Sequence, residues 1–91
     1  MEALGSFNGR GSIIQDGNVL GVVGYECNVY DDDGENAGIG FLAGTAELIA
    51  TASMASNLIL RLADGQEMAI VITKTIGNDA EFATDGPIPG Y

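Results

Sequence analysis

The chain has 91 residues, of which 13 are acidic and 3 are basic, so its formal net charge is −10. Nucleic acids and anionic membranes are both bound largely through Lys and Arg, so three basic residues exclude a nucleic-acid partner and argue against a membrane surface. Histidine is absent, which removes the commonest general base and the commonest transition-metal ligand.

The length predicts a single small β domain over residues 1–91. Residues 1–8 show no periodicity and are interpreted as a loose N-terminal segment. A short strand is predicted over residues 9–15 and a long one over 19–30. The residues between them, Asp16-Gly17-Asn18, are typical of a hairpin turn.

The long strand alternates between an apolar core face and a mixed face. The core face carries Val19, Gly21, Val23, Tyr25, Cys27 and Val29. Gly21 and Gly24 favour a bend or a bulge in this strand, because glycine interrupts regular pairing. The opposite face includes Leu20 and Val22, which are also apolar.

A charged run over residues 31–36 is interpreted as the tip of a second hairpin, followed by a strand over residues 37–45. One face of this strand carries Ile39, Phe41 and Ala43, and the other carries Gly38, Gly40, Leu42 and Gly44. A row of glycines allows a backbone or an aromatic ring to pack closely. The strand could therefore leave space inside the fold.

Residues 46–55 contain good helix formers, which favours a short helix, but they also alternate, so an extension of the preceding strand stays open. A clear hairpin follows over residues 57–76. One face of its first strand carries Leu58, Leu60 and Leu62. One face of its second strand carries Met68, Ile70 and Ile72. A last strand is predicted over residues 80–84, before a Pro/Gly tail over residues 85–91 that forms an extended tail or an edge cap.

These elements give about six strands joined by short turns. The predicted fold is therefore all-β and antiparallel, a small barrel with a two-layer sandwich as the alternative, with one short helix near residues 46–55. A barrel is favoured because the long, glycine-broken strand over residues 19–30 can serve both sides of a closed sheet.

The residue types argue against catalysis and against a bound cofactor. The single cysteine forms no internal disulfide, and Cys27 lies on a core face, which predicts a buried and unreactive thiol. Without histidine, the chain can form neither a Ser-His nor a Cys-His nucleophile, and it cannot form a zinc site with Cys and His ligands. The chain is therefore predicted not to be an enzyme.

The charged run over residues 31–36 also contains the carboxylates that a cation site needs. An EF-hand loop with Gly34 at its sixth position would begin at Val29 and end at Gly40, and neither supplies a carboxylate. A looser site formed within residues 31–35 stays open beside the interpretation of a solvated hairpin tip.

Apolar residues on both faces of several strands exceed what a core of this size can cover. We therefore expect a non-catalytic protein-interaction or assembly module, with a protein partner that is another chain or a second copy in a homodimer. The candidate interaction surface consists of Leu20, Val22, Tyr30, Ile59 and Val71. One alternative is a barrel that binds a small molecule or an ion; another is an acidic mimic of nucleic acid.

The N-terminal residues lack a basic region followed by an apolar stretch, which predicts a cytoplasmic protein. Residues 36–60 contain one charged residue, Glu47, and are long enough to span a bilayer. They also carry Gly, Thr, Ser and Asn throughout, and a charge in mid-span is costly, so a membrane span is not expected.

Overall fold

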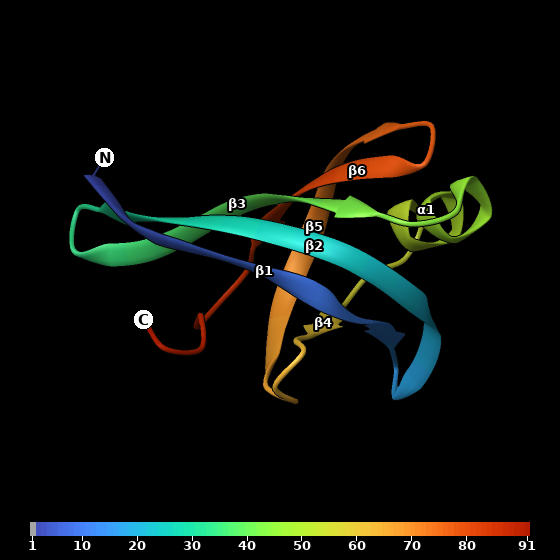
Figure 1. Cartoon of the computed structure of the whole chain (residues 1–91), viewed down its shortest axis with the longest axis horizontal. Helices are drawn as coiled ribbons and strands as arrows, with labels where there is room; N and C mark the ends of the chain where they lie inside the picture. The colour runs from blue at the N-terminus through green and yellow to red at the C-terminus, as the bar shows by residue number, and fades with distance from the viewer. Residues whose placement is uncertain (1) are drawn as a thin grey trace.

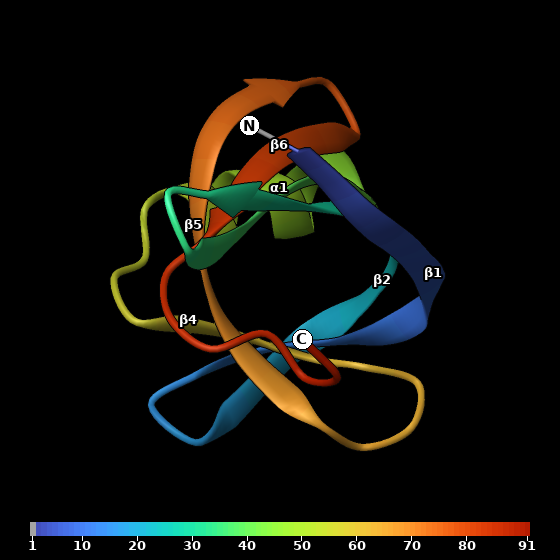
Figure 2. The ribbon, with the colours of Figure 1, turned by 90° about the vertical axis from the view of Figure 1, so that its left-hand side faces the viewer.

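The computed structural model describes residues 2–91, which form six strands in a closed antiparallel barrel and one helix (Figure 1). The elements are β1 (Glu2–Gln15), β2 (Asn18–Asp32), β3 (Glu35–Ala43), α1 (Ala46–Ser53), β4 (Leu58–Arg61), β5 (Glu67–Ile76) and β6 (Asp79–Thr84). The strand order around the ring is β1-β2-β3-β6-β5-β4, and the ring is visible end-on in Figure 2. The predicted all-β barrel is therefore confirmed, and the sandwich alternative is not what forms.

Two three-stranded meanders, β1-β2-β3 and β4-β5-β6, build the ring and are linked by α1. They join where β1 pairs with β4 and where β3 pairs with β6. These two pairings involve only part of the first meander. β4 pairs with residues 12–15 of β1, and β6 pairs with residues 39–43 of β3. The remainder of β1, β2 and β3 continues as a three-stranded extension beyond the ring (Figure 1).

The N-terminal segment differs from the expectation. Residues 2–8 are not loose but form the first half of β1, paired with residues 26–31 of β2. Small and polar residues such as Gly5 and Ser6 hide the alternation, and an irregularity between Ala3 and Gly5 breaks its period. Pairing with the long neighbour, rather than its own pattern, defines this half of the strand.

The two predicted hairpin turns are confirmed. Asp16 and Gly17 have φ of 50° and 82°, and Asp33 and Gly34 have φ of 54° and 85°. Positive φ at both central residues matches the right-handed twist of the flanking strands, and Asp-Gly is a favoured pair for it. At the second turn the Asp31 carboxylate accepts the Gly34 N–H at 2.9 Å.

The barrel interior is filled by the inward faces of the strands and one face of α1. The predicted leucine face of β4 and the following turn is buried, as are Met68, Ile70 and Cys27. The largest fully buried side chain is Phe82. Among residues 2–91 no polar or charged side chain is buried, so hydrophobic burial stabilises this core.

A bulge in β2 reverses one predicted face. Ile13 lies opposite Gly21 and Ile14 lies opposite Val19, so Leu20 has no opposing residue on β1. Val19, expected in the core, is consequently 57% exposed, whereas Leu20, expected on the outer face, packs against the core. The predicted irregularity near Gly21 is present, and it re-aims the two side chains that precede it.

Helix α1 replaces the strand extension left open by the sequence. Its N-cap is Thr45, whose hydroxyl oxygen accepts the Leu48 N–H at 3.1 Å. Ile49 and Ala52, one turn apart on the same face, are buried. The Leu48 side chain lies over Gly21 of β2, where an added Cβ would be 2.8 Å from Leu48 Cδ2.

The Pro/Gly tail over residues 85–91 crosses the end of the barrel at which β1 begins (Figure 2). Its Ile88 side chain is buried, with 5% exposed. The Tyr91 ring stacks on Phe7 of β1 at a centroid distance of 6.4 Å. The tail therefore packs as a cap on the barrel end rather than extending into solvent.

Candidate interaction surface

The structure does not bring the five predicted surface residues together. Leu20 packs against the core. Val22 is exposed on β2, at the position that pairs with Ser12 of β1. Tyr30 lies in the three-stranded extension, between Ala3 and Ala37. Only Ile59 and Val71 share a region, the outer face of the neighbouring strands β4 and β5.

These two residues belong to a continuous apolar strip on the outer wall of the barrel. Ile39 on β3 lies opposite Ala83 on β6, and Ala83 lies opposite Val71 on β5. Opposed residues on one face have Cβ atoms about 4.5–5.5 Å apart, so the row is contiguous. The apolar strip consists of Ile39, Phe41, Ala83, Val71, Ala69 and Ile59.

Three residues of the strip are large and substantially exposed. The exposed fractions are 41% for Ile39, 46% for Phe41 and 49% for Val71. Sequence reasoning placed Ile39 and Phe41 on one face of their strand but did not assign them to a site. The available signal was that the opposite face of this strand carries glycines and Leu42, which marks that opposite face as the one packed in the interior.

Carboxylates flank the aromatic end of the strip. Phe41 lies opposite Glu26 of β2 on one side and opposite Glu81 of β6 on the other. Glu81 accepts a hydrogen bond from the Thr73 hydroxyl at 3.0 Å. The exposed ring is thus held between two negatively charged side chains on the same outer face.

A hollow of about 500 Å³, open to solvent, lies beside Phe41. Its lining includes Glu26, Asp79 and the short residues Gly24 and Ala43. Gly24 and Ala43 are opposed across β2 and β3, so two neighbouring positions have little or no side chain. The lining of the hollow therefore combines the apolar ring of Phe41, two positions with little or no side chain, and two carboxylates.

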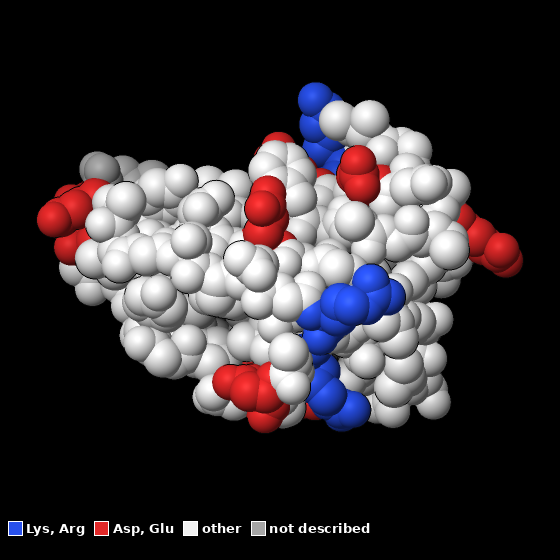
Figure 3. Space-filling view, in the orientation of Figure 1, with Lys and Arg blue, Asp and Glu red and all other residues white. Residues whose placement is uncertain are grey.

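Charge on the visible face is distributed in separate groups rather than as one acidic surface. Figure 3 shows acidic side chains in separate groups, at the β2–β3 end, in the upper middle of the face, at its lower edge and near α1, with uncharged surface and basic side chains between the groups. A mimic of nucleic acid would need a continuous acidic face to fill a basic groove. This face does not have one.

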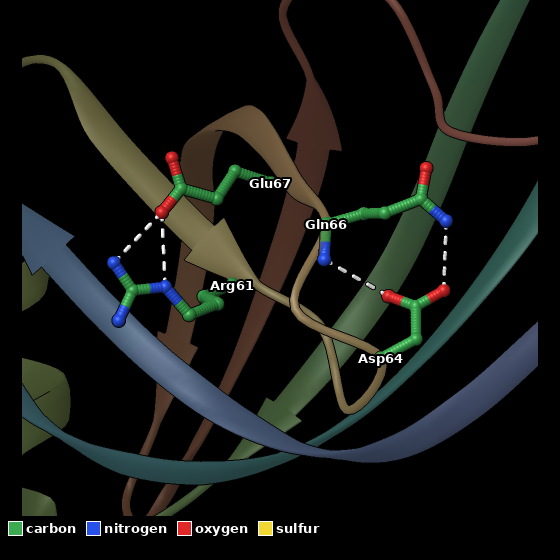
Figure 4. Close-up of polar contacts among 4 residues, drawn as sticks. All are labelled: Arg61, Asp64, Gln66 and Glu67. Carbon is green, nitrogen blue, oxygen red and sulfur yellow. Dashed lines mark hydrogen bonds and ion pairs between the residues drawn. The ribbon is translucent and has the colours of Figure 1, made fainter.

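The β4–β5 turn contains the charged contacts of Figure 4. Arg61 Nε donates a hydrogen bond to Glu67 Oε2 at 2.9 Å, and the Arg61 Nη2 atom forms an ion pair with the same oxygen at 2.9 Å. Asp64 accepts the Gln66 backbone N–H at 3.0 Å and the Gln66 side-chain amide at 2.8 Å. These two hydrogen bonds hold the pKa of Asp64 below its usual value. Both pairs of contacts fasten the turn, and the Arg61–Glu67 pair lies next to the Ile59 and Ala69 end of the apolar strip.

Side chains of the protein occupy the positions beside the glycine row of β3, where an interior cavity was one alternative. An added Cβ on Gly38 would be 2.9 Å from Cys27 Sγ, and one on Gly40 would be 2.7 Å from Phe82 Cζ. The glycines admit neighbouring side chains of the protein itself. The space beside Gly38 and Gly40 is therefore filled by Cys27 and Phe82.

The structure gathers no metal site and no reactive thiol within residues 2–91. No group of three His, Cys, Asp or Glu side chains is placed to hold an ion there, including at the acidic hairpin tip. Cys27 has 0% exposure, and burial raises the pKa of its thiol to about 11. At neutral pH the group is a protonated, packed side chain.

The chain matches no protein-family model, no curated protein and no solved structure. Within residues 2–91, none of the helical structure is long and apolar enough to cross a membrane.

Proposed function

We propose that this protein is a non-catalytic interaction module whose apolar strip binds a partner protein. The observation that carries the proposal is the contiguity of the strip: six apolar side chains on four adjacent strands, with Phe41 and Val71 each nearly half exposed. Covering apolar surface yields roughly 25 cal/mol per Å² removed from water. Contiguous exposed apolar patches on soluble proteins commonly mark interaction sites.

The surroundings of the strip indicate the character of the partner. Glu26 and Glu81 lie on either side of Phe41, and the chain as a whole carries a net charge of −10. A complementary surface would place apolar side chains over the strip and Lys or Arg at its rim. The net charge would also accelerate the encounter with such a basic partner at low ionic strength.

Affinity capture with surface variants tests the proposal. Phe41→Ser and Val71→Ser remove strip side chains without changing the charge, and Val22→Ser makes the same kind of change at a position that is 55% exposed and outside the strip. Proteins captured from a native extract by the wild type should be retained by the Val22 variant. Phe41→Ser should weaken their binding by about tenfold or more, because aromatic side chains that become buried in an interface commonly contribute about 2 kcal/mol or more.

Circular dichroism and urea unfolding of each variant would establish that the barrel is intact. If the captured proteins bind both strip variants as well as they bind the wild type, the strip is not the binding surface. If no protein is captured by the wild type at any ionic strength, the proposal of a partner-binding module fails.

A further inference from the structure

The hollow beside Phe41 is shaped by the strand register of the outer barrel wall. Gly24 of β2 and Ala43 of β3 pair with each other and form its floor. Apart from chain neighbours, the one atom of residues 2–91 within 4 Å of a Cβ added to Gly24 is the Ala43 carbonyl oxygen, at 4.0 Å. No side chain of the protein therefore fills the space above this floor, which is open to an occupant from outside.

Polar and aromatic side chains border the floor. Asn8 of β1 lies opposite Glu26 of β2, and Glu26 lies opposite Phe41 of β3. This row is two residues along each strand from the floor, so it shares the outer face with the floor. Asp79 of β6, opposite Ala43, borders the floor at its other end. An occupant would therefore meet a carboxylate on each of two sides, with the Phe41 ring on the strand between them.

Basic side chains of the chain itself do not neutralise these two carboxylates. Among residues 2–91 the one ion pair joins Arg61 and Glu67. Arg10 lies opposite Gly24, at the β1 end of the floor, but it does not line the hollow. A concave surface lined by charges of one sign concentrates their potential. The hollow therefore combines a negative potential with an exposed aromatic ring.

We propose that the hollow receives an arginine side chain of the partner protein that covers the apolar strip. A guanidinium group is planar, stacks on aromatic faces and donates paired hydrogen bonds to carboxylates. Phe41 is nearly half exposed and belongs to both the strip and the hollow, so one ring contacts the apolar side chains and the cation. The inference deepens the proposed function and rests on it, because the arginine belongs to the same partner.

The lining of the hollow favours arginine over other cations. A metal ion is disfavoured because no group of three His, Cys, Asp or Glu side chains within residues 2–91 is placed to hold one. A lysine ammonium is a compact, strongly hydrated charge, whereas a guanidinium is more weakly hydrated and lies flat against a ring. The Asn8 amide oxygen at the edge of the hollow is a further acceptor for its N–H groups.

Titration with Nα-acetyl-arginine amide tests the hollow without the partner. This probe carries the guanidinium as its one charge, Nα-acetyl-citrulline amide is its neutral analogue, and Nα-acetyl-lysine amide carries the same charge on an ammonium. At matched ionic strength, the arginine probe should give saturable shifts in amide NMR spectra around Glu26, Phe41 and Ala43. We expect a dissociation constant on the order of 10 mM for a single side chain. The lysine probe should bind about threefold or more weakly, and the citrulline probe should give no saturable shift.

Four variants locate the site. Glu26→Gln and Glu35→Gln each change the net charge from −10 to −9, but Glu35 lies at the far end of β3, opposite Asp32. Glu26→Gln should raise the dissociation constant of the arginine probe about threefold or more, whereas Glu35→Gln should leave it nearly unchanged. Phe41→Leu keeps an apolar side chain but removes the ring, and should raise the constant about twofold or more. Ala43→Leu fills the hollow from an exposed position and should abolish the binding.

Circular dichroism and urea unfolding establish that each variant is folded. Equal shifts with the arginine and citrulline probes, or no saturable shift up to about 100 mM, would overturn the inference. So would equal affinity for the lysine probe, or a loss of affinity in Glu35→Gln as large as in Glu26→Gln.

Capture from a native extract separates this inference from the proposed function. If Val71→Ser loses the captured proteins while Glu26→Gln and Ala43→Leu retain them fully, the strip binds the partner but no arginine enters the hollow. A hollow that selects the arginine probe, on a chain that captures no protein, would overturn the proposed function and with it the assignment of the arginine to a partner protein.

Discussion

The ring of Phe82 on β6 occupies the space in which residue 40 of β3 would carry a side chain. A Cβ added to Gly40 would lie 2.7 Å from Phe82 Cζ and would press on the carbonyl oxygen of Glu26. Phe82 is completely buried. The absence of a side chain at Gly40 therefore allows a large aromatic ring to fill the centre of a small barrel.

Gly40→Ala should destabilise the protein by about 1–3 kcal/mol, the usual range for overpacking a core. The cost should fall toward the upper end because one obstructing atom belongs to the backbone and cannot rotate away. Gly24→Ala is the matched control, since its added Cβ would meet only the Ala43 carbonyl oxygen at 4.0 Å. We expect that control to change stability by less than about 0.5 kcal/mol. Urea unfolding followed by circular dichroism measures both, and equal losses would contradict this account.

The hydrogen bond at the hydroxyl of Tyr25 should also contribute measurably to the free energy of unfolding. Its oxygen accepts the Ala63 N–H at 2.9 Å and so connects β2 to the β4–β5 turn. Tyr25→Phe keeps the ring, which packs edge-on to Phe7, and removes this hydrogen bond. The expected loss is about 0.5–1.5 kcal/mol. Tyr30→Phe, in the half-exposed position on the extension, is the control; a loss as large as that of Tyr25→Phe would show that the hydrogen bond is not the cause.

Local alternation predicted the inward faces of most strands, including the leucines of β4 and the buried Cys27. Alternation failed where a β-bulge gives one strand an extra residue relative to its neighbour. Leu20 is such a position, because its bulge shifts Val19 outward. It also failed over residues 2–8, where pairing with β2 rather than side-chain pattern defines the strand. Both failures come from strand pairing, which a single strand's sequence does not contain.

The candidate surface required information of the same kind. Ile39 and Val71 are far apart in the sequence and share a row only because β6 lies between β3 and β5. The sequence indicated that the glycine row would allow a backbone or an aromatic ring to pack closely, but it did not identify Phe82 as the ring that packs there. Strand order around the ring determines both outcomes, and turns and periodicity constrain that order weakly.

The C-terminal tail should contribute to stability through Ile88. This side chain is 5% exposed, and its Cδ1 lies 3.3 Å from the position of a Cβ on Gly38. Ile88→Ala should cost about 2–4 kcal/mol, by loss of burial and creation of a cavity. Pro87→Ala, at an exposed position in the same tail, should cost far less. Comparable unfolding midpoints for wild type and Ile88→Ala would mean that the tail does not cap the barrel.

Burial of Cys27 predicts both slow labelling and a pH dependence. Since burial raises the pKa of the thiol to about 11, folding favours the protonated form over the thiolate. This contribution to stability is fully present below the unfolded-state pKa of about 8.5 and is lost as the pH rises toward the folded value. A thiol reagent at neutral pH should label Ser6→Cys at position 6 at once and Cys27 only as the protein opens. Equal labelling rates at the two positions would contradict the buried environment.

Asp64 predicts a change of stability at the acidic end of the pH scale. The Gln66 backbone N–H, and then the Gln66 side chain, lower the pKa of this exposed carboxyl. Because the folded-state pKa lies below the unfolded one, the stabilisation is present above the unfolded-state pKa of about 3.9 and is lost as the pH falls through the folded value. The free energy of unfolding of the wild type should therefore exceed that of Asp64→Asn near neutrality, and the difference should shrink in acid. Gln66→Ala keeps the backbone donor and should retain part of the pH dependence. A difference between wild type and Asp64→Asn that stayed constant across this pH range would show that the two hydrogen bonds do not discriminate between the ionised and the neutral carboxyl.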